Sequence, residues 1–387
     1  MKKYKLGLLP KVIIAIVSGI TLGYFLPEGV VRIFITFNGI FSNFLSFCIP
    51  LIILGLVAPG ISDLGKKAGK LLLITVVLAY GSSLFSGFYT YFSCKSLFGY
   101  LDLGNAPVTI DHPESISSIP FFKIDMPPVF DVMTALILAF VLGIGAAAVG
   151  ADTLKKFFQE FKQIVELLIS RIIIPLLPLY IFGIFLSMSY SGSTLQIISI
   201  FGKVIGIIFV LHIFLLIIQF CIAGVVGRQN PFKLLYRMLP AYMTALGTSS
   251  SAATIPVTLE QVKRNGVSED VADFCVPLCA TIHLSGSTMK IVAMSLAVCM
   301  IQGLPYDLQL YSGFIMLLGI MMIAAPGVPG GAIMASVALL QSFLGFDGQS
   351  VGLMIALYIA IDSFGTACNV TGDGAIAIIV DKIAQKH

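Results

Sequence analysis

Long apolar stretches separated by short polar ones run the length of the chain. Eight of them are continuous, and each is long enough to cross a bilayer core of roughly 30 Å, which takes about 20 helical residues. They cover approximately residues 7–26, 32–58, 71–93, 128–149, 164–189, 195–226, 271–301 and 349–380. The pattern predicts eight transmembrane helices.

Two further apolar stretches, residues 238–260 and 310–345, are interrupted by Gly, Ser, Thr and Pro. Inside a bilayer, irregular backbone is tolerated only where protein buries it or where it lines a cavity. We therefore expect each stretch to fold as a re-entrant helical hairpin. Because the apolar segments after about residue 230 are all interrupted in this way, we expect the working site in the second half of the chain.

The composition supports a membrane protein. Hydrophobic residues make up 58% of the chain and charged residues 11%, whereas a typical soluble domain carries roughly 25% charged residues. The chain has too few charged residues to cover a water-exposed surface. The predicted fold class is therefore an all-α polytopic membrane protein. Soluble enzymes, disordered chains, nucleic-acid-binding domains and disulfide-stapled secreted domains are excluded. The seven cysteines form no CxxC pair and are typical of small apolar residues in helices.

Basic residues gather in alternate loops, and their distribution predicts the topology. The loops on one side contain Lys2, Lys3, Lys5, Lys66, Lys67, Lys70, Lys155, Lys156, Lys162, Arg228, Lys233, Arg237, Lys382 and Lys386. The positive-inside rule then places both termini in the cytoplasm. The long polar segment at residues 100–127 becomes an outer loop. We expect a multi-pass protein of the bacterial inner membrane, in contact with lipid and not with nucleic acid.

Four polar residues in the last span form one stripe. Asp362, Thr366, Asn369 and Asp373 are spaced i, i+4, i+7 and i+11, which keeps them within an arc of about 60° on a helix. Carboxylates within a membrane are costly and usually face a cavity, an ion or a substrate. The alternative is a polar contact that only holds neighbouring helices together.

Both interrupted stretches contain helix-breaking sequences. The first has a run of hydroxyl residues ahead of Pro256: Thr248, Ser249, Ser250, Ser251 and Thr254. Such a run favours a helix break whose free N–H groups can face an anion, although small residues also serve simple helix packing. The second contains AAPGVPGGA at residues 324–332, which cannot continue a helix and suits a gate over a binding site.

The seventh span contains ATIHLSGSTMK at residues 280–290, where Gly286 among hydroxyl residues predicts an unwound segment. Lys290 either extends toward a helix end, as lysines often do in membranes, or lies in a polar cavity. Ser287 and Lys290 also match S-x-x-K, a pattern of some serine acyl-enzymes. An intramembrane serine hydrolase is therefore a distant alternative.

Taken together, the serine-rich TSSSAATIP tip, the GVPG tip and the NVTGD last helix resemble the dicarboxylate/amino-acid:cation symporter family, which has the glutamate transporter homologue fold. The resemblance covers essentially the whole chain in segment order. It implies inverted repeats and an elevator-type transporter, usually a homotrimer. Residues 1–230 then form mainly a scaffold, with spans 3 and 6 shared, and residues 231–387 form the transport core.

The resemblance also implies roles for individual residues. Ser250 and Ser251 fall at the tip that contacts a substrate carboxylate, and Asp362 matches the aspartate that holds a substrate amino group. Asn369 and Asp373 match a sodium site, so the one coupling ion implied is Na⁺, with no other cofactor. The remaining positions implied for the substrate site are Ser287, Val328, Pro329, Gly330, Gly365, Thr366 and Asn369.

Several positions depart from the family pattern. Members that carry acidic substrates have an arginine where this chain has Gly365, and without it a second carboxylate would be left unpaired in a buried site. Where the family has Asn-Met-Asp-Gly-Thr, this chain begins with His283 and replaces the aspartate of a deeper sodium site with Ser285. Lys290 occupies a position that is usually aromatic, and we consider His283 and Lys290 possible coupling residues.

The sequence therefore predicts a symporter coupled to sodium or protons, and not an enzyme. By these departures its substrate is a small amino acid that is neutral rather than acidic. The alternative within transport is a dicarboxylate or another organic anion that is not an amino acid.

Overall fold

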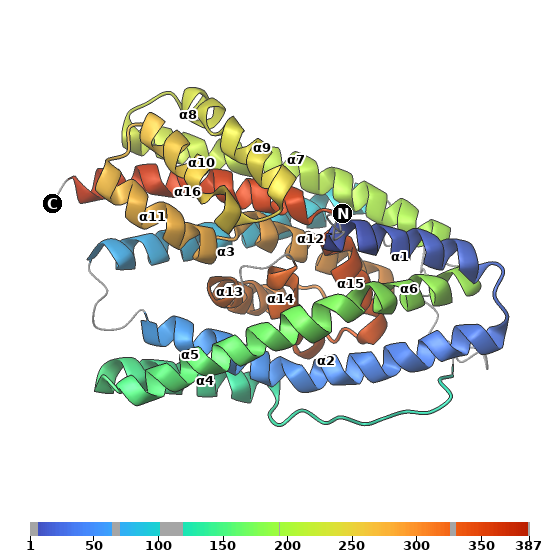
Figure 1. Ribbon diagram of the computed structural model, residues 1–387. Coiled ribbons are helices and arrows are strands. Elements are labelled where there is room, and N and C mark those ends of the chain that lie inside the picture. The colour runs from blue at the N-terminus through green and yellow to red at the C-terminus, as the bar shows by residue number, and fades with distance from the viewer. Residues whose placement is uncertain (1–6, 64–69, 101–118, 193, 326–329, 386–387) are drawn as a thin grey trace, which may run out of the picture.

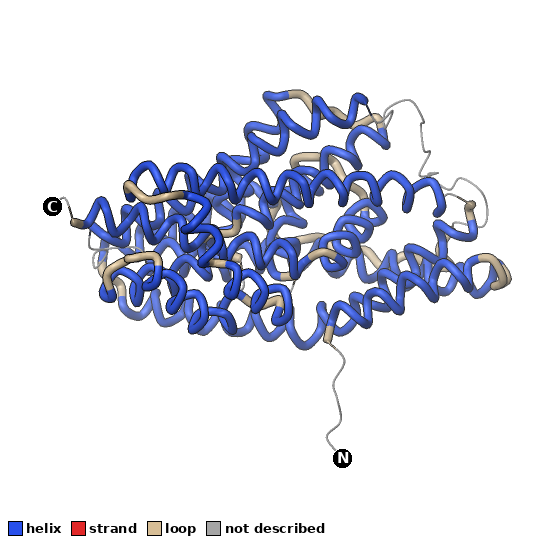
Figure 2. Tube along the Cα trace, turned by 90° about the horizontal axis from the view of Figure 1, so that it is seen from above, coloured by secondary structure: helices blue, strands red, loops and turns tan. Residues whose placement is uncertain are grey.

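The computed structural model describes residues 7–63, 70–100, 119–192, 194–325 and 330–385. These parts of the chain are almost entirely helical and contain no β-strand. The long helices lie side by side, roughly along one common axis, as Figures 1 and 2 show. An all-helical bundle of this kind satisfies backbone hydrogen bonds within each segment, as a bilayer requires.

The first half of the chain consists of mostly apolar helices, several of them long. They are α1 (Leu8–Gly23), α2 (Glu28–Asp63), α3 (Lys70–Tyr100), α4 (Val132–Val149), α5 (Asp152–Leu168), α6 (Ile174–Tyr190) and α7 (Thr194–Gly227). A π-helical turn, Ile169–Ile173, joins α5 to α6 into one continuous rod. The segment that precedes α4 runs along α2, where Arg32 and Asn43 donate hydrogen bonds to the carbonyls of Ile119 and Ile124.

The second half consists of shorter helices. They are α8 (Pro231–Arg237), α9 (Leu239–Thr248), α10 (Ser251–Arg264), α11 (Glu269–Ile282), α12 (Ser285–Gln302), α13 (Leu308–Ala324), α14 (Gly331–Ser342), α15 (Gly348–Ala360) and α16 (Asp362–Ala384). In each of the pairs α9/α10, α11/α12 and α15/α16 only one or two residues separate the helices. This half therefore brings many helix ends into the interior of the bundle.

The two halves pack differently. In the lower part of Figure 1, α2 lies against α4, α5 and α6. In the upper part, α16 is surrounded by α7, α9, α10, α11 and α12, and α12 also packs along α3. As a result α12 and α16 are almost wholly enclosed by protein, so their polar side chains must find partners within the molecule.

The expected membrane segments agree only in part with the helices. Within the described residues, six helical segments are long and apolar enough to cross a membrane, and five more apolar helices are shorter. The predicted count of eight spans with two hairpins stays a prediction. Residues 152–163 were expected in a loop that contains Lys155, Lys156 and Lys162, but they belong to α5, an amphipathic helix whose charged face hides it from a search for apolar runs.

The helix breaks also differ from expectation. In the seventh span, Gly286 was expected to mark unwound backbone, but the break falls at His283 and Leu284, and Gly286 lies in the first turn of α12. A Cβ atom on Gly286 would lie 2.7 Å from Cβ of Cys368, so the glycine permits close contact between α12 and α16. The last span is broken at Ile361, which the sequence did not reveal.

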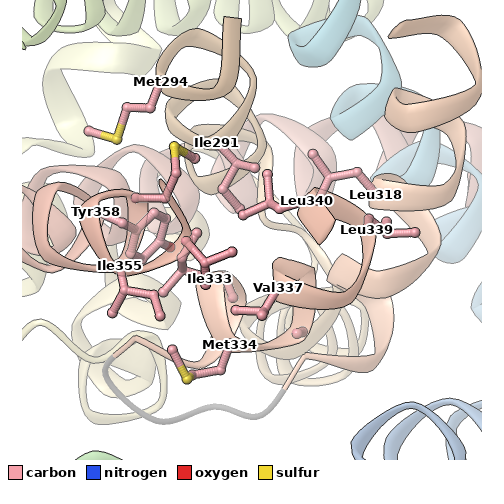
Figure 3. Packing of buried hydrophobic residues seen from close by; sticks show 14 of the residues in the cluster. Ile291, Met294, Leu318, Ile333, Met334, Val337, Leu339, Leu340, Ile355 and Tyr358 are labelled. Atoms are coloured by element: carbon pink, nitrogen blue, oxygen red, sulfur yellow. The ribbon is translucent and has the colours of Figure 1, made fainter. Parts of the chain in front are cut away.

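A hydrophobic cluster supports the centre of the molecule. Figure 3 shows Ile291 and Met294 of α12, Ile333 and Leu340 of α14, and Tyr358 of α15 among its members. All five are at least 96% buried. The cluster fixes the positions of the helices whose ends build the site.

Candidate functional site

A small polar cavity lies where the interrupted helices meet. Its volume is about 70 Å³, and its walls come from the junction of α9 and α10, the end of α11, the beginnings of α12 and α14, the end of α15 and the first two turns of α16. One water molecule needs roughly 10–15 Å³ by this measure. The cavity is therefore the size of a solute with a handful of non-hydrogen atoms.

The first wall of the cavity is the junction between α9 and α10. Ser249 adopts the left-handed conformation, with φ of 50°, and ends α9. Ser250 caps α10, because its hydroxyl accepts a hydrogen bond from the N–H of Ala253. Ser251 and Ala252, in the first turn of α10, line the cavity. A helix N-terminus carries partial positive charge, so this wall suits an anionic group. Pro256 lies inside α10 and is not the point of the break.

The second wall is the beginning of α14. Gly330 has φ of 76°, a conformation that glycine adopts without strain, and it caps the helix. Its N–H donates to Oδ2 of Asp362 at 3.0 Å. The predicted site residues Val328 and Pro329 lie outside the described residues, together with Gly327. A second helix N-terminus, with Gly330, Gly331 and Ala332, therefore lines the same cavity.

The stripe expected on the last span is present on α16. Asp362, Thr366 and Asn369 all line the cavity, while Asp373 lies one turn deeper. The hydroxyl of Thr366 donates to the carbonyl oxygen of Asp362, so its oxygen can still accept a hydrogen bond from a bound molecule. Among the described residues that line the cavity, Asp362 is the only one with a charged side chain.

A buried network connects the cavity to α12. The Ser287 hydroxyl accepts hydrogen bonds from the Tyr358 hydroxyl at 2.9 Å and from Nδ2 of Asn369 at 3.1 Å. Oδ1 of Asn369 accepts from the N–H groups of Gly286 and Ser287. Both polar atoms of Asn369 are thus engaged with α12, whereas the Ser287 hydroxyl keeps its own proton to donate into the cavity that it lines.

Lys290 is buried and does not extend toward a helix end. Its side chain is 0% exposed, and Nζ lies 3.1 Å from Oδ1 of Asp362. The same ammonium lies 3.6 Å from the centre of the Tyr358 ring. Of the two alternatives for Lys290, extension toward a helix end is wrong, because an acidic and an aromatic partner hold the ammonium inside the protein. The ammonium also lies beside Gly365, the position at which acidic-substrate relatives carry arginine.

A second polar cluster lies deeper in the core. Nδ1 of His283 is 2.8 Å from Oδ1 of Asp373, and its Nε2 is 3.0 Å from the Ser82 hydroxyl. Gln219 donates to the hydroxyls of Ser82 and Ser285. The described residues hold no group of three or more His, Cys, Asp or Glu side chains arranged for a metal ion. Sodium at Asn369 and Asp373 stays a prediction.

Three residues of these networks were missed by sequence reasoning. Tyr358 lies in an apolar run one turn before Asp362, and nothing in the sequence distinguishes it from a core tyrosine. Gln219 and Ser82 could have been found, because an uncharged polar residue inside an otherwise apolar span commonly faces the interior of a bundle.

Broken helices whose ends converge on a small polar cavity inside an apolar bundle define the substrate-binding core of a secondary transporter. Comparison with known proteins gives the family. The model of the sodium:dicarboxylate symporter family matches residues 8–383, and the chain belongs to that family. It is therefore a multi-pass membrane transporter of the symporter type and not an enzyme, which excludes the serine hydrolase alternative.

Two curated relatives are similar along nearly their whole length. Both are named serine/threonine transporter SstT, from Acinetobacter baumannii strains ATCC 17978 and AYE. Each is 26% identical to this chain over an alignment of 396 positions. The alignment covers 97% of this chain and 97% of the relative.

Proposed function

We propose that this protein is a symporter of a small neutral amino acid across the bacterial inner membrane, driven by sodium ions or protons. The observation that carries the proposal is the cavity itself, which combines one carboxylate, Asp362, with two helix N-termini. An α-amino acid presents the complementary pair of groups, one ammonium and one carboxylate, on the same carbon atom.

The arrangement suggests how such a substrate is held. Its carboxylate accepts hydrogen bonds from the first turn of α10, where Ser250 and Ser251 lie. Its ammonium donates to Asp362 and to the Thr366 hydroxyl. Each oxygen of a carboxylate can accept more than one hydrogen bond, so Asp362 keeps capacity for the ammonium beside its bonds to Lys290 and Gly330.

An acidic side chain on the substrate would find no partner. Gly365 supplies no arginine, and the ammonium of Lys290 is enclosed behind Asp362 rather than exposed in the cavity. An unpaired carboxylate in so small a site is strongly disfavoured. The names of the relatives, serine/threonine transporters, support the same substrate class.

A second candidate is an organic anion without an amino group. It is favoured by one observation, namely that both oxygens of Asp362 already have partners inside the protein. In that case the lysine takes the place of the substrate ammonium. A screen that includes small hydroxy acids and dicarboxylates beside neutral amino acids separates the two candidates.

The remaining architecture belongs to the same proposal. Residues 1–230 act mainly as the scaffold of a homotrimer, and residues 231–387 act as the core that moves in an elevator mechanism, with both termini in the cytoplasm. The coupling ion binds in the region of Asn369, Asp373 and His283.

The test is uptake by the purified full-length protein in liposomes. We expect a neutral amino acid to accumulate against its gradient when a sodium or proton gradient is imposed. Asp362→Asn should lower uptake at least about tenfold, because the substrate ammonium loses more than ~1.4 kcal/mol of interaction. Asp270→Asn, at an exposed carboxylate in the first turn of α11, is the matched control. Normal uptake by Asp362→Asn would refute the assignment.

A further inference from the structure

Lys290 is the most unusual charged residue of the molecule, since a fully buried lysine in the middle of a membrane helix is rare. It projects from the second turn of α12 and ends beside the first residue of α16, Asp362. Neither helix contains another side chain that pairs with this ammonium among the described residues. Lys290 and Asp362 thus form an isolated pair of opposite charges.

The surroundings of the ammonium are arranged for a cation. Asp362 lies at 3.1 Å, the carbonyl oxygen of Ile361 at 3.5 Å, and the face of the Tyr358 ring at 3.6 Å. Ile361 follows the C-terminus of α15, where the helix dipole is negative. Each of these groups attracts positive charge, and an aromatic face does so strongly when water is excluded.

The absence of a side chain at position 365 makes room for this ammonium. A Cβ atom on Gly365 would overlap with both Cε and Nζ of Lys290. The end of the lysine side chain therefore occupies the place where a side chain at position 365 would begin. Lys290 does not line the cavity, whereas its partners Asp362 and Tyr358 both do. The charged group that meets a bound molecule is therefore Asp362 and not Lys290.

We propose that Lys290 is a tethered counter-ion that gives Asp362 the positive charge a co-transported cation would otherwise have to supply. This inference rests on the proposed function, and it explains how the proposed substrate site stays electrically neutral. With Lys290 present, the pair and a zwitterionic amino acid sum to zero charge, so the substrate binds at Asp362 without an accompanying cation. Without Lys290, the same site carries one uncompensated negative charge inside the membrane. Lys290 is a positioning residue that acts on the substrate through Asp362.

The experiment compares the wild-type protein, Lys290→Met and the double variant Lys290→Met/Asp362→Asn, all full-length and purified in nanodiscs. Lys203→Met, at an exposed lysine of α7, controls for the loss of a positive charge. Thermal unfolding without substrate and the dissociation constant for L-serine are measured in sodium chloride and in choline chloride of equal concentration. Sodium bound elsewhere in the core affects all variants alike. The informative quantity is therefore the difference between Lys290→Met and wild type in how much sodium changes the unfolding temperature and the dissociation constant.

We expect sodium to tighten L-serine binding at least about tenfold more in Lys290→Met than in wild type, a typical size for coupling between neighbouring sites. Sodium should also raise the unfolding temperature of substrate-free Lys290→Met more than that of wild type. The extra response should vanish in the double variant, where no charge is left to compensate. A merely structural lysine would change the unfolding temperature by the same amount in both salts.

Equal sodium responses in Lys290→Met and wild type would overturn the proposal. If Lys290→Met does not fold while the double variant does, the unpaired Asp362 is the cause and the proposal is supported. If neither variant folds, the lysine serves packing and the proposal is overturned. Failure of wild type to bind any amino acid refutes the proposed substrate class alone, because the substrate-free unfolding measurement still decides the role of Lys290.

Discussion

Replacement of Ser287 by alanine tests the network that joins the cavity to α12. The substitution removes the acceptor for two buried donors, the Tyr358 hydroxyl at 2.9 Å and Nδ2 of Asn369 at 3.1 Å. A buried donor left without a partner costs about 1–3 kcal/mol. Asn369 keeps the bonds to its Oδ1, so we expect a total loss of about 3 kcal/mol of stability. The lost hydroxyl proton should also weaken substrate binding.

The chain offers a convenient assay and a matched control. It contains no tryptophan, and its seven cysteines are free, with six of them buried, so a thiol-reactive dye reports unfolding as the core opens. Ser336→Ala is the control, because this buried hydroxyl donates only to the carbonyl of Ile333 in its own helix. The double variant Ser287→Ala/Tyr358→Phe also lacks the Tyr358 hydroxyl. It should recover part of the stability that Ser287→Ala loses, since no hydroxyl is then left unpaired.

Two results would refute this reasoning. One is a Ser287→Ala variant that is as stable as Ser336→Ala. The other is a further loss of stability when Tyr358→Phe is added, which would show that Tyr358 stabilises the core by a contact other than its bond to Ser287.

Two further substitutions test other parts of the molecule. Gly365→Ala should displace the Lys290 ammonium and break its pair with Asp362, at a cost of about 3–5 kcal/mol, whereas the same change in Lys290→Ala, which lacks the side-chain atoms that the new methyl group would meet, should cost much less. Comparison of unfolding temperatures measures both, and equal costs in the two backgrounds would contradict the contact. Asp381→Asn should cost about 1–3 kcal/mol, because Asp381 is buried and accepts bonds from the backbone and the hydroxyl of Ser268. It lies about 28 Å along α16 from Asp362 by helical rise, so the affinity for substrate should be unchanged; a shift in the dissociation constant would show that the two ends of α16 are coupled.

Much of the helical architecture could be predicted from hydropathy, but the helix breaks could be predicted only where small polar residues mark them. The hydroxyl run at residues 248–251 identified the junction of α9 and α10. The break at Ile361 has no such signature, because an isoleucine and an aspartate are compatible with a continuous helix. Its cause is tertiary, since the first turn of α16 is held by contacts of Asp362 with Gly330 and Lys290.

The stripe on α16 could be predicted because helical periodicity alone places Asp362, Thr366 and Asn369 on one face. The partner of Asp362 could not. Lys290 and Asp362 are 72 positions apart, and periodicity within one helix says nothing about which side chain of another helix will meet it. The sequence showed a missing arginine at position 365 and an extra lysine at position 290 as two separate departures. The structure shows that both concern the same small volume.

That shared volume imposes an order on evolution. A side chain at position 365 and the present position of the Lys290 side chain compete for the same space, so an arginine on α16 and this lysine on α12 cannot both occupy it. A lineage that passes from the arginine to the lysine must therefore lose the side chain at position 365 before the lysine can take its present position.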